Sequence, residues 1–375
     1  MLLFLLSLIA VIVVSSFFWS VVPERGRFVA SVVSQKDLED WFDEIFVKNS
    51  LSGTVLITQK DHIRFEKSYG WADPMQKILN HPNSQFNIGS CTKQMTGFLI
   101  LQLEKEGKLN RADHLEKVIP ELSDTQIGTV TINQLLEMSG GVPDLMEPMT
   151  YVSVQLSSKA WSSEEILQEI KNYPLNFKSG TQYEYSNLSY VLLGIAIEKI
   201  TGHSWEQSLQ QRIFSPFEMF DTRVSRGQSI ESLTKPFLMC PRFVFWGPVI
   251  YLPMPQWNYS TLKGAGGVVS TVIDLQRWQL GLTKFAEEEP ELASRYFGGG
   301  GPGNYSYGWQ IIESPNTPIQ FHAGETPGYC ALIVRCPNST AILLFNSDFM
   351  LLKQSSMEAL QNQVISILET LEDSS

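Results

Sequence analysis

Ser90 and Lys93 are three residues apart in a stretch whose pattern predicts a helix. Gly89 lies directly before them, where the chain must turn sharply to enter that helix. Ser90 then falls in the first helical turn and Lys93 lies one turn on along the same face, so an amine comes within reach of a hydroxyl. The helical pattern rests on the apolar residues that follow Lys93: Met95, Phe98, Leu99, Leu101 and Leu103.

This pair has the chemistry of an activated nucleophile. A serine hydroxyl attacks poorly until a base takes its proton, and a partly desolvated lysine can do so. The N-terminal end of a helix disfavours the charged ammonium and offers free N–H groups to an oxyanion. The same spacing also separates Ser232 from Lys235 and Ser260 from Lys263, so spacing alone equally fits a surface serine and lysine.

Composition limits the classes of protein that the chain can be. The 375 residues are 43% hydrophobic and 18% charged, enough for a large core in one large or two interleaved domains. A net charge of −11 argues against a nucleic-acid partner. The four cysteines form no C-x-x-C pair and the five histidines lack metal-ligand spacing, so we expect no metal site and no cofactor.

Residues 1–22 are apolar except for four serines. As a helix they would reach roughly 33 Å at about 1.5 Å per residue, enough to cross a bilayer. The segment lacks the positive n-region and short apolar core of a signal peptide, so an uncleaved anchor and a cleaved signal both stay open. Residues 23–34 follow as a linker. Either alternative places the catalytic part outside the cytoplasm, anchored to the membrane or secreted.

The elements that would position the pair come from both ends of the chain. An amphipathic helix over 35–49 is followed by two strands, 53–59 and 63–69. The last quarter returns to strands, with a turn over 325–328, before a closing helix over 353–371. Its expected strands are short apolar runs: 307–312, 318–322, 329–335 and 340–345.

Most of the chain between these two groups of strands has helical periodicity. The order of elements predicts an α+β fold, an antiparallel sheet flanked by N- and C-terminal helices with a mostly helical domain inserted. We expect one domain over 35–375. Its sheet part would be formed by about 35–93 and 305–375, and its helical insert by about 94–300.

Two more places carry candidate site residues. Tyr185 and Asn187 lie one residue apart on the loop that enters an apolar helix, where a phenol and an amide can point into one cleft. The structural alternative is that Tyr185 packs and Asn187 caps the helix. His322 ends an expected strand that would face the Ser90 helix, and its alternative is a satisfied structural histidine.

Three motifs, in this order, resemble those of the serine β-lactamase and penicillin-binding protein superfamily: Ser90-Cys-Thr-Lys93, Tyr185-Ser-Asn187 and His322-Ala-Gly324. The resemblance is closest to the branch of class C β-lactamases, D,D-carboxypeptidases and related esterases, and it covers about residues 35–370. It implies a β-lactamase/transpeptidase-like fold. It also implies a serine hydrolase, without a cofactor, that hydrolyses an amide or ester in a small-molecule or peptide substrate with an acyl group.

The resemblance implies roles for these residues. Ser90 attacks a carbonyl and forms an acyl-enzyme, which water then hydrolyses. Lys93 and Tyr185 share the general-base and proton-shuttle role, and which of them takes the first proton stays open. Gly324 and Glu325 would contact the substrate, and the backbone N–H groups of Ser90 and Glu325 would form the oxyanion hole.

Asn187 would bind the amide side of the substrate, and His322 would line the cleft and orient the substrate or Tyr185. At the position of His322, class C β-lactamases usually carry lysine, whose fixed charge suits a substrate carboxylate better than a largely neutral histidine does. This departure favours a peptidase or an esterase, with β-lactam reactivity still open. Cys91 faces another side of the helix from Lys93 and is not expected to be the nucleophile.

The alternative to a serine hydrolase is a catalytically silent, membrane-held binding or scaffold protein with the same fold.

Overall fold

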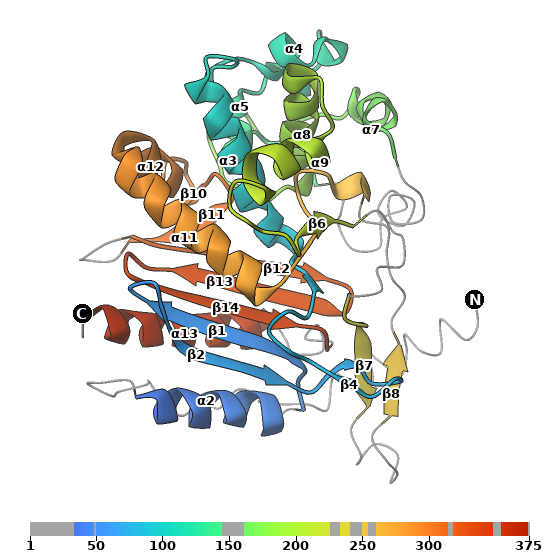
Figure 1. Cartoon of the computed structure of the whole chain (residues 1–375). Helices are drawn as coiled ribbons and strands as arrows, with labels where there is room; N and C mark the ends of the chain where they lie inside the picture. Colours follow the sequence, from blue (N-terminus) through green and yellow to red (C-terminus); the bar gives the residue numbers. More distant parts are fainter. Residues whose placement is uncertain are drawn as a thin grey trace.

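Figure 1 shows the computed structural model of the chain, which describes residues 34–48, 50–144, 161–225, 233–240, 250–253, 260–313, 318–347 and 354–373. The membrane or signal segment expected over 1–22 and nearly all of the linker over 23–34 lie outside these ranges. Within them, no helix reaches the length and apolarity that a membrane crossing requires.

A seven-stranded antiparallel sheet forms the centre of the molecule (Figure 1). Its strands lie in the order β10-β11-β12-β13-β14-β1-β2. Their bounds are β1 (Gly53–Gln59), β2 (His62–Tyr69), β10 (Tyr305–Ser306), β11 (Trp309–Ile312), β12 (Ile319–Thr326), β13 (Tyr329–Arg335) and β14 (Ser339–Phe345). β1 pairs with β14 from Gly53↔Phe345 to Gln59↔Ser339, so the first strand lies beside the last. The antiparallel α+β sheet expected from the sequence is confirmed.

The run expected as one strand over 307–312 contains a turn at Tyr307 and Gly308 followed by β11, and β10 precedes it. Tyr307 and Gly308 adopt positive φ angles of 49° and 85°, and they reverse the chain between Ser306 and Trp309. Two successive residues with positive φ are typical of the tight turn of a β-hairpin. The expected strand was wrong because a tyrosine in this conformation carries no turn signal in the sequence.

The strand expected to end at His322 continues as β12 to Thr326. Its ladder with β13 extends to the pair Thr326↔Tyr329, so Glu325, expected in a turn, also belongs to the strand. Glycine and proline near this point favour a break, but pairing with a fully buried strand overrides that preference. His322 therefore lies within a strand and not at its end.

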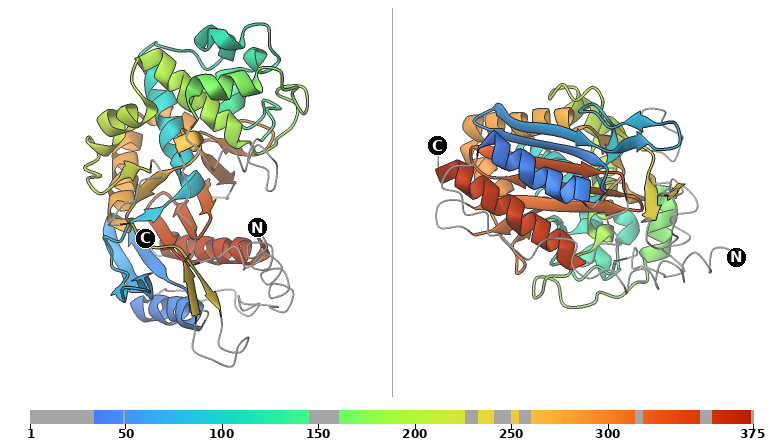
Figure 2. Two further views of the ribbon diagram at one scale, coloured as in Figure 1. Left: turned by 90° about the vertical axis from the view of Figure 1, so that its right-hand side faces the viewer. Right: turned by 90° about the horizontal axis from the view of Figure 1, so that it is seen from below.

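Two helices from opposite ends of the chain cover one face of the sheet: α2 (Gln35–Lys48) and α13 (Gln354–Asp373). The view from below in Figure 2 shows them side by side against the strands. Phe46 of α2 stacks on Phe345 of β14 with 5.0 Å between ring centroids. These are the helices expected over 35–49 and 353–371, and the flanking by N- and C-terminal helices is confirmed.

The opposite face carries α3 (Thr92–Lys105) and α11 (Val272–Glu288), with the smaller helices packed around them (Figure 1). Side chains of β1 alternate between the two cores. Val55 and Ile57 belong to the core under α2 and α13, whereas Leu56 belongs to the core that contains α3. This alternation is the expected pattern of a strand that is buried on both faces.

The remaining helices are α4 (Leu115–Val118), α5 (Ile132–Leu136), α7 (Ser163–Ile170), α8 (Asn187–Thr201), α9 (Trp205–Leu209) and α12 (Pro290–Phe297). The small strands are β3 (Trp71–Asp73), β4 (Ile78–Leu79), β5 (Phe86–Asn87), β6 (Arg223–Val224), β7 (Phe237–Cys240), β8 (Ile250–Pro253) and β9 (Val268–Ser270). β5, β9 and β6 form a three-stranded sheet. Because β5 lies just before α3, this pairing fixes the point at which the chain enters that helix.

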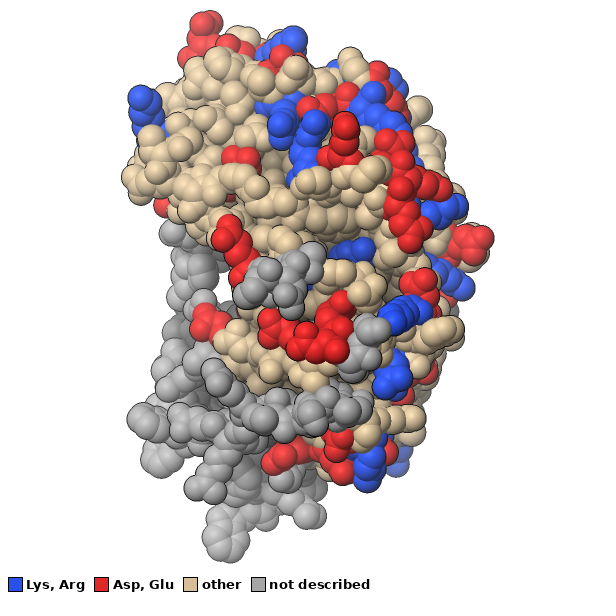
Figure 3. All heavy atoms as spheres, turned by 90° about the vertical axis from the view of Figure 1, so that its left-hand side faces the viewer, with Lys and Arg blue, Asp and Glu red and all other residues tan. Residues whose placement is uncertain are grey.

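α3 is the helix around which the helical part packs. Phe98, near its middle, contacts Trp278 of α11 and Tyr296 of α12 edge to face, with ring centroids 5.3 and 5.5 Å apart. Arg295 of α12 pairs with Glu104 of α3 at 3.0 Å. On the face drawn in Figure 3, charged side chains of both signs are interspersed. α3 is therefore held by apolar contacts along its length and by ion pairs near its C-terminal end.

Candidate active site

Ser90 lies on a 3-10 turn, η1 (Gly89–Cys91), that leads directly into α3. The sequence placed it in the first turn of the helix, and the structure tightens that turn. Gly89 has a φ of +51°, which side chains with a Cβ rarely adopt. The sharp entry expected at this glycine is therefore present.

The amine of Lys93 is the most enclosed polar group of the site. The side chain has 0% exposure, and its Nζ lies 2.9 Å from Ser90 Oγ. Nζ also donates to Asn187 Oδ1 and to the backbone oxygen of Ala265, both at 2.8 Å. Burial lowers the pKa of Lys93 to about 7, because the charged form loses its water, and the negative charge of Asp144 opposes this shift.

Tyr185 approaches the same hydroxyl from another side. Its Oη donates to Ser90 Oγ at 2.8 Å. Lys93 Nζ lies 5.0 Å from the centre of the Tyr185 ring. Burial raises the pKa of Tyr185, so this side chain stays a neutral phenol across the physiological range. Ser90 Oγ thus has an amine on one side and a phenol on the other.

Asn187 is held at both ends of its amide. Its Oδ1 accepts from Lys93, and its Nδ2 donates to Asp144 Oδ2 at 3.0 Å. Its backbone N–H donates to Asp144 Oδ1 at 3.2 Å. Asn187 is the first residue of α8, and the N-cap is Ser186, whose hydroxyl accepts from the Ser189 N–H. The structural alternative for Asn187, a capping role, is therefore wrong.

The His322 ring is buried beside the site and packs against the side chains that line it. The side chain is 3% exposed, and its ring centroid lies 6.2 Å from that of Tyr185. Nε2 lies 2.9 Å from Tyr305 Oη, and Nδ1 lies 2.5 Å from the backbone oxygen of Ala323. Since a carbonyl can only accept, Nδ1 carries the proton and the Tyr305 hydroxyl donates to Nε2. Burial lowers the pKa of His322 to about 3, so it is neutral at physiological pH.

The part of β12 that follows His322 contacts η1, the turn that carries Ser90. A Cβ on Gly324 would lie 2.0 Å from the Ile88 oxygen and 3.0 Å from the Ser90 nitrogen. A Cβ on Gly89 would lie 2.8 Å from the Glu325 nitrogen. The backbone nitrogens of Ser90 and Glu325, the pair expected to form an oxyanion hole, therefore lie on either side of a contact that only glycine permits.

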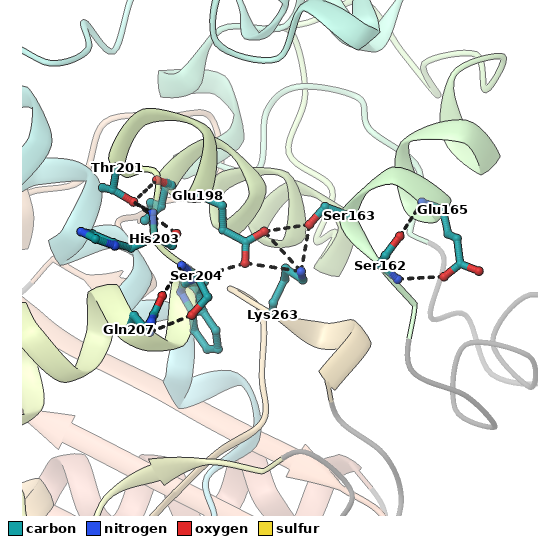
Figure 4. Close-up of polar contacts among 11 residues, drawn as sticks. Ser162, Ser163, Glu165, Glu198, Thr201, His203, Ser204, Gln207 and Lys263 are labelled. Atoms are coloured by element: carbon teal, nitrogen blue, oxygen red, sulfur yellow. Dashed lines mark hydrogen bonds and ion pairs between the residues drawn. The ribbon is translucent and has the colours of Figure 1, made fainter.

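The second S-x-x-K match within the described residues has a different environment. Lys263 donates to Ser163 Oγ at 2.9 Å and pairs with Glu198 at 3.3 Å (Figure 4). Ser260, three residues before it, lies on the 3-10 turn η5 (Ser260–Leu262). This lysine is held by a carboxylate and links α7, α8 and the chain before β9. The remaining match begins at Ser232, outside the described residues.

Cys91 is buried beside the nucleophile candidate without sharing its chemistry. Its thiol donates to the His322 backbone oxygen at 3.2 Å, and burial raises its pKa to about 12. A thiol in that state is inert as a nucleophile. In the described part of the chain, no group of three or more His, Cys, Asp or Glu side chains could hold a metal ion.

Three residues of the arrangement were missed by sequence reasoning: Asp144, Ala265 and Tyr305. Asp144 follows the Gly-Gly-Val-Pro segment, which marks the end of a helix but gives no sign of a site. Ala265 contributes only its backbone oxygen, which any residue could supply. Tyr305 lies in β10, the first strand of the β10–β11 hairpin, just before the run that was expected as a strand. A tyrosine that directly follows a glycine-rich loop was the one signal available for it.

Comparisons with known proteins agree with the geometry. The family model described as Beta-lactamase matches residues 38–361. Penicillin-binding protein 4* of Bacillus subtilis (strain 168) is 27% identical over 328 residues, which cover 84% of this chain and 72% of that protein. Protein flp of Staphylococcus aureus (strain MW2) is 25% identical over 315 residues, 81% of this chain and 61% of that protein. The chain thus spans somewhat less than two thirds of the staphylococcal relative.

Solved structures share the fold. A D-amino acid amidase from Ochrobactrum anthropi SV3, complexed with L-phenylalanine amide, superposes with a TM-score of 0.73 at 22% identity, covering 90% of this chain and 99% of that one. The octameric penicillin-binding protein homologue from Pyrococcus abyssi gives a TM-score of 0.68 at 23% identity, covering 84% and 74%. The β-lactamase/transpeptidase-like fold expected from the motifs is confirmed.

The contact between η1 and β12 generates a prediction. Gly324→Ala should abolish formation of an acyl-enzyme, because its Cβ would collide with the Ile88 oxygen and move the Ser90 nitrogen. Overpacking of this kind costs about 1–3 kcal/mol of stability. The control is Gly202→Ala at the end of α8, where φ is +69° and nothing lies within 4 Å of the added Cβ. It should lower stability by about 1 kcal/mol and keep the acylation rate. Rapid acylation in a folded Gly324→Ala protein would contradict the expectation that the Ser90 and Glu325 nitrogens form the oxyanion hole.

Proposed function

We propose that this chain, which belongs to the Beta-lactamase family, is a serine hydrolase that forms an acyl-enzyme on Ser90 and hydrolyses an amide or ester. One observation carries the proposal. The Lys93 amine and the Tyr185 phenol both lie within hydrogen-bond distance of Ser90 Oγ, at 2.9 and 2.8 Å. A serine with a base and a proton carrier both within hydrogen-bond distance fits acyl transfer.

Lys93 is the base in this proposal. A neutral amine has two hydrogens and one lone pair. Asn187 Oδ1 and the Ala265 oxygen are acceptors at 2.8 Å, so they take the two hydrogens and leave the lone pair for the Ser90 hydroxyl. A pKa lowered to about 7 supports the same role, because a substantial part of Lys93 is then neutral at physiological pH.

Tyr185 acts as the proton carrier. Its raised pKa makes it a poor first base, whereas as a phenol it donates to Ser90 Oγ and can pass a proton to the leaving group. The Ser90 and Glu325 N–H groups stabilise the oxyanion while the Ser90 ester forms and the leaving group departs. Water then attacks the ester, with the same groups acting in reverse, and Ser90 is regenerated.

The substrate class that we propose follows from the protonation state and the hydrogen bonds of His322. Its ring nitrogens already bond to Tyr305 and Ala323, and its low pKa keeps it neutral. It therefore offers no positive charge to a substrate carboxylate, and its effect reaches the reaction through packing against Tyr185. We propose that the acyl substrate is neutral next to the scissile bond, as in an ester or a peptide amide, and that β-lactam reactivity is secondary.

Location is part of the proposal. Residues 1–22 are long and apolar enough to reach a membrane as an anchor or to direct export as a signal. Every motif of the site lies far downstream of them, so neither alternative changes the chemistry. We propose an extracytoplasmic enzyme, anchored or secreted, that meets its substrate there.

The nucleophile is tested by substitution. Ser90→Ala should abolish hydrolysis and covalent labelling by a fluorescent phosphonate while the fold stays intact, because it removes the oxygen that is acylated. Intact-protein mass spectrometry of the labelled chain is the measurement. Ser260→Ala and Ser232→Ala, at the other two S-x-x-K matches, should keep wild-type labelling. A phosphonate adduct on Ser90→Ala would sink the proposal.

The base is tested by pH. With a pKa of about 7, Lys93 is mainly protonated below neutral pH and mainly free above it. Acylation should therefore rise with pH through about 7 and stay level up to pH 9. Lys93→Arg keeps the charge but does not deprotonate, so it should lower acylation at least about 100-fold at every pH. Near-wild-type rates in Lys93→Arg would leave Tyr185 as the base.

Substrate charge gives a further test. N-acetyl-D-alanyl-D-alanine carries a carboxylate next to the scissile amide, and its methyl ester carries a neutral group there. Release of N-acetyl-D-alanine measures cleavage of the shared amide, so hydrolysis of the methyl ester itself is not counted. We expect kcat/KM at least about tenfold higher for the methyl ester, because its counterpart carries a carboxylate for which His322 supplies no charge. Ser90→Ala gives the background rate for both. A preference for the free acid would show that another group neutralises the carboxylate.

A further inference from the structure

We infer that Asp144 is a positioning residue that sets the orientation of the Asn187 amide and, through it, the direction of the Lys93 lone pair. The inference rests on the proposed function, because it concerns the base of that reaction. The carboxylate of Asp144 contacts Asn187 twice, at the side-chain Nδ2 (3.0 Å) and at the backbone N (3.2 Å). One side chain thus holds both the amide of Asn187 and the first turn of α8.

An ionised carboxylate accepts hydrogen bonds and donates none. The NH2 end of the Asn187 amide must therefore face Asp144, and its oxygen must face Lys93. With the amide reversed, an oxygen would meet the carboxylate and the NH2 group would meet the Lys93 amine. The first contact is repulsive, and the second competes with Ser90 for the lone pair. Asp144 thus selects the one orientation in which Lys93 can accept the serine proton.

Asp144 also has an electrostatic effect on Lys93, one amide group away. The titratable groups that face Lys93 are Cys91 before α3, Tyr185 before α8, Tyr190 in α8, His322 in β12 and Asp144 itself. Burial keeps the cysteine, the tyrosines and the histidine neutral near pH 7. Asp144 is then the charged group of this set, and its negative charge favours the protonated lysine.

Asp144 also explains what Asn187 does in this site. The sequence led us to expect that its amide would bind the substrate. The structure gives its oxygen to Lys93 and one of its N–H groups to Asp144. Asn187 is therefore chiefly a link between a carboxylate and the base. Its substitution should change the acylation rate more than it changes substrate affinity.

The experiment compares Asp144→Asn with wild type by two measurements. The first is the titration of Lys93 by NMR in protein labelled with 13C at lysine Cε, with Lys93→Arg to assign the signal. Removing one charge across an amide, at an effective dielectric constant of about 20, should lower the midpoint by about one to two pH units. The second is the acylation rate at the high-pH plateau, which should fall at least about tenfold because the Asn187 amide is free to reverse.

Asp43→Asn is the matched control. Asp43 is a half-buried carboxylate that also accepts from a lysine, Lys67 at 2.8 Å, but it belongs to α2, which covers the far face of the sheet. The Asp43→Asn variant should leave the titration midpoint of Lys93 and the high-pH acylation rate unchanged. Asp144→Glu restores the charge and should return the midpoint toward that of wild type.

A double-mutant cycle shows whether Asp144 acts through Asn187. In an Asn187→Ala background, Asp144→Asn should change the plateau less than about twofold. An equal loss in both backgrounds, or an unchanged Lys93 midpoint in a folded Asp144→Asn protein, would overturn the inference. A shifted midpoint in a protein that never forms an acyl-enzyme would support the role of Asp144 and refute the hydrolase. The two proposals can therefore fail separately.

Discussion

The site depends on a lysine amine that has no access to water. Removing a charged amine from water costs several kcal/mol even after the protein relaxes, so Lys93 has to be either neutral or well paired. The groups that contact the Lys93 amine satisfy this constraint with neutral oxygen atoms more than with a charged partner. Asn187 and Ala265 offer oxygens at 2.8 Å, and the carboxylate of Asp144 stands one amide further away. The contrast is Lys263, whose amine lies 3.3 Å from Glu198. The first arrangement favours a base, and the second favours a permanent cation.

That amine can be enclosed because three rigid elements meet around it. α3 carries Lys93, α8 begins at Asn187, and the chain before β9 supplies Ala265. The fourth element is β12, which touches the turn of Ser90 through Gly324. Positions on helices and strands are held more accurately than positions on loops. The hydroxyl, the amine and the two backbone nitrogens are therefore placed by the core itself, and a packing change in the core is felt at the site.

The sequence was informative where side chains carry the chemistry and local patterns carry the structure. The S-x-x-K spacing ahead of a helical run identified Ser90 and Lys93, and the flanking helices followed from periodicity. The sequence failed where the determinant is a backbone atom or a distant contact. The identity of Ala265 does not predict that its backbone oxygen will accept a hydrogen bond from a lysine. The partner of His322 Nε2 is Tyr305, which lies in the first strand of a hairpin that only the φ angles of Tyr307 and Gly308 reveal.

The strand order has a consequence for how the protein is made. β1 is synthesised before the other strands of this sheet, but its partner on one side, β14, is the last of the seven. Until then the first hairpin exposes an open edge of apolar residues, and such edges promote aggregation. The oxyanion nitrogens also meet only when β12 arrives, far from Ser90 in sequence. A growing chain therefore carries Ser90, the proposed nucleophile, well before the rest of the proposed site is synthesised. The proposed activity therefore requires both ends of the sheet, and we expect it only after β12 to β14 have folded onto β1.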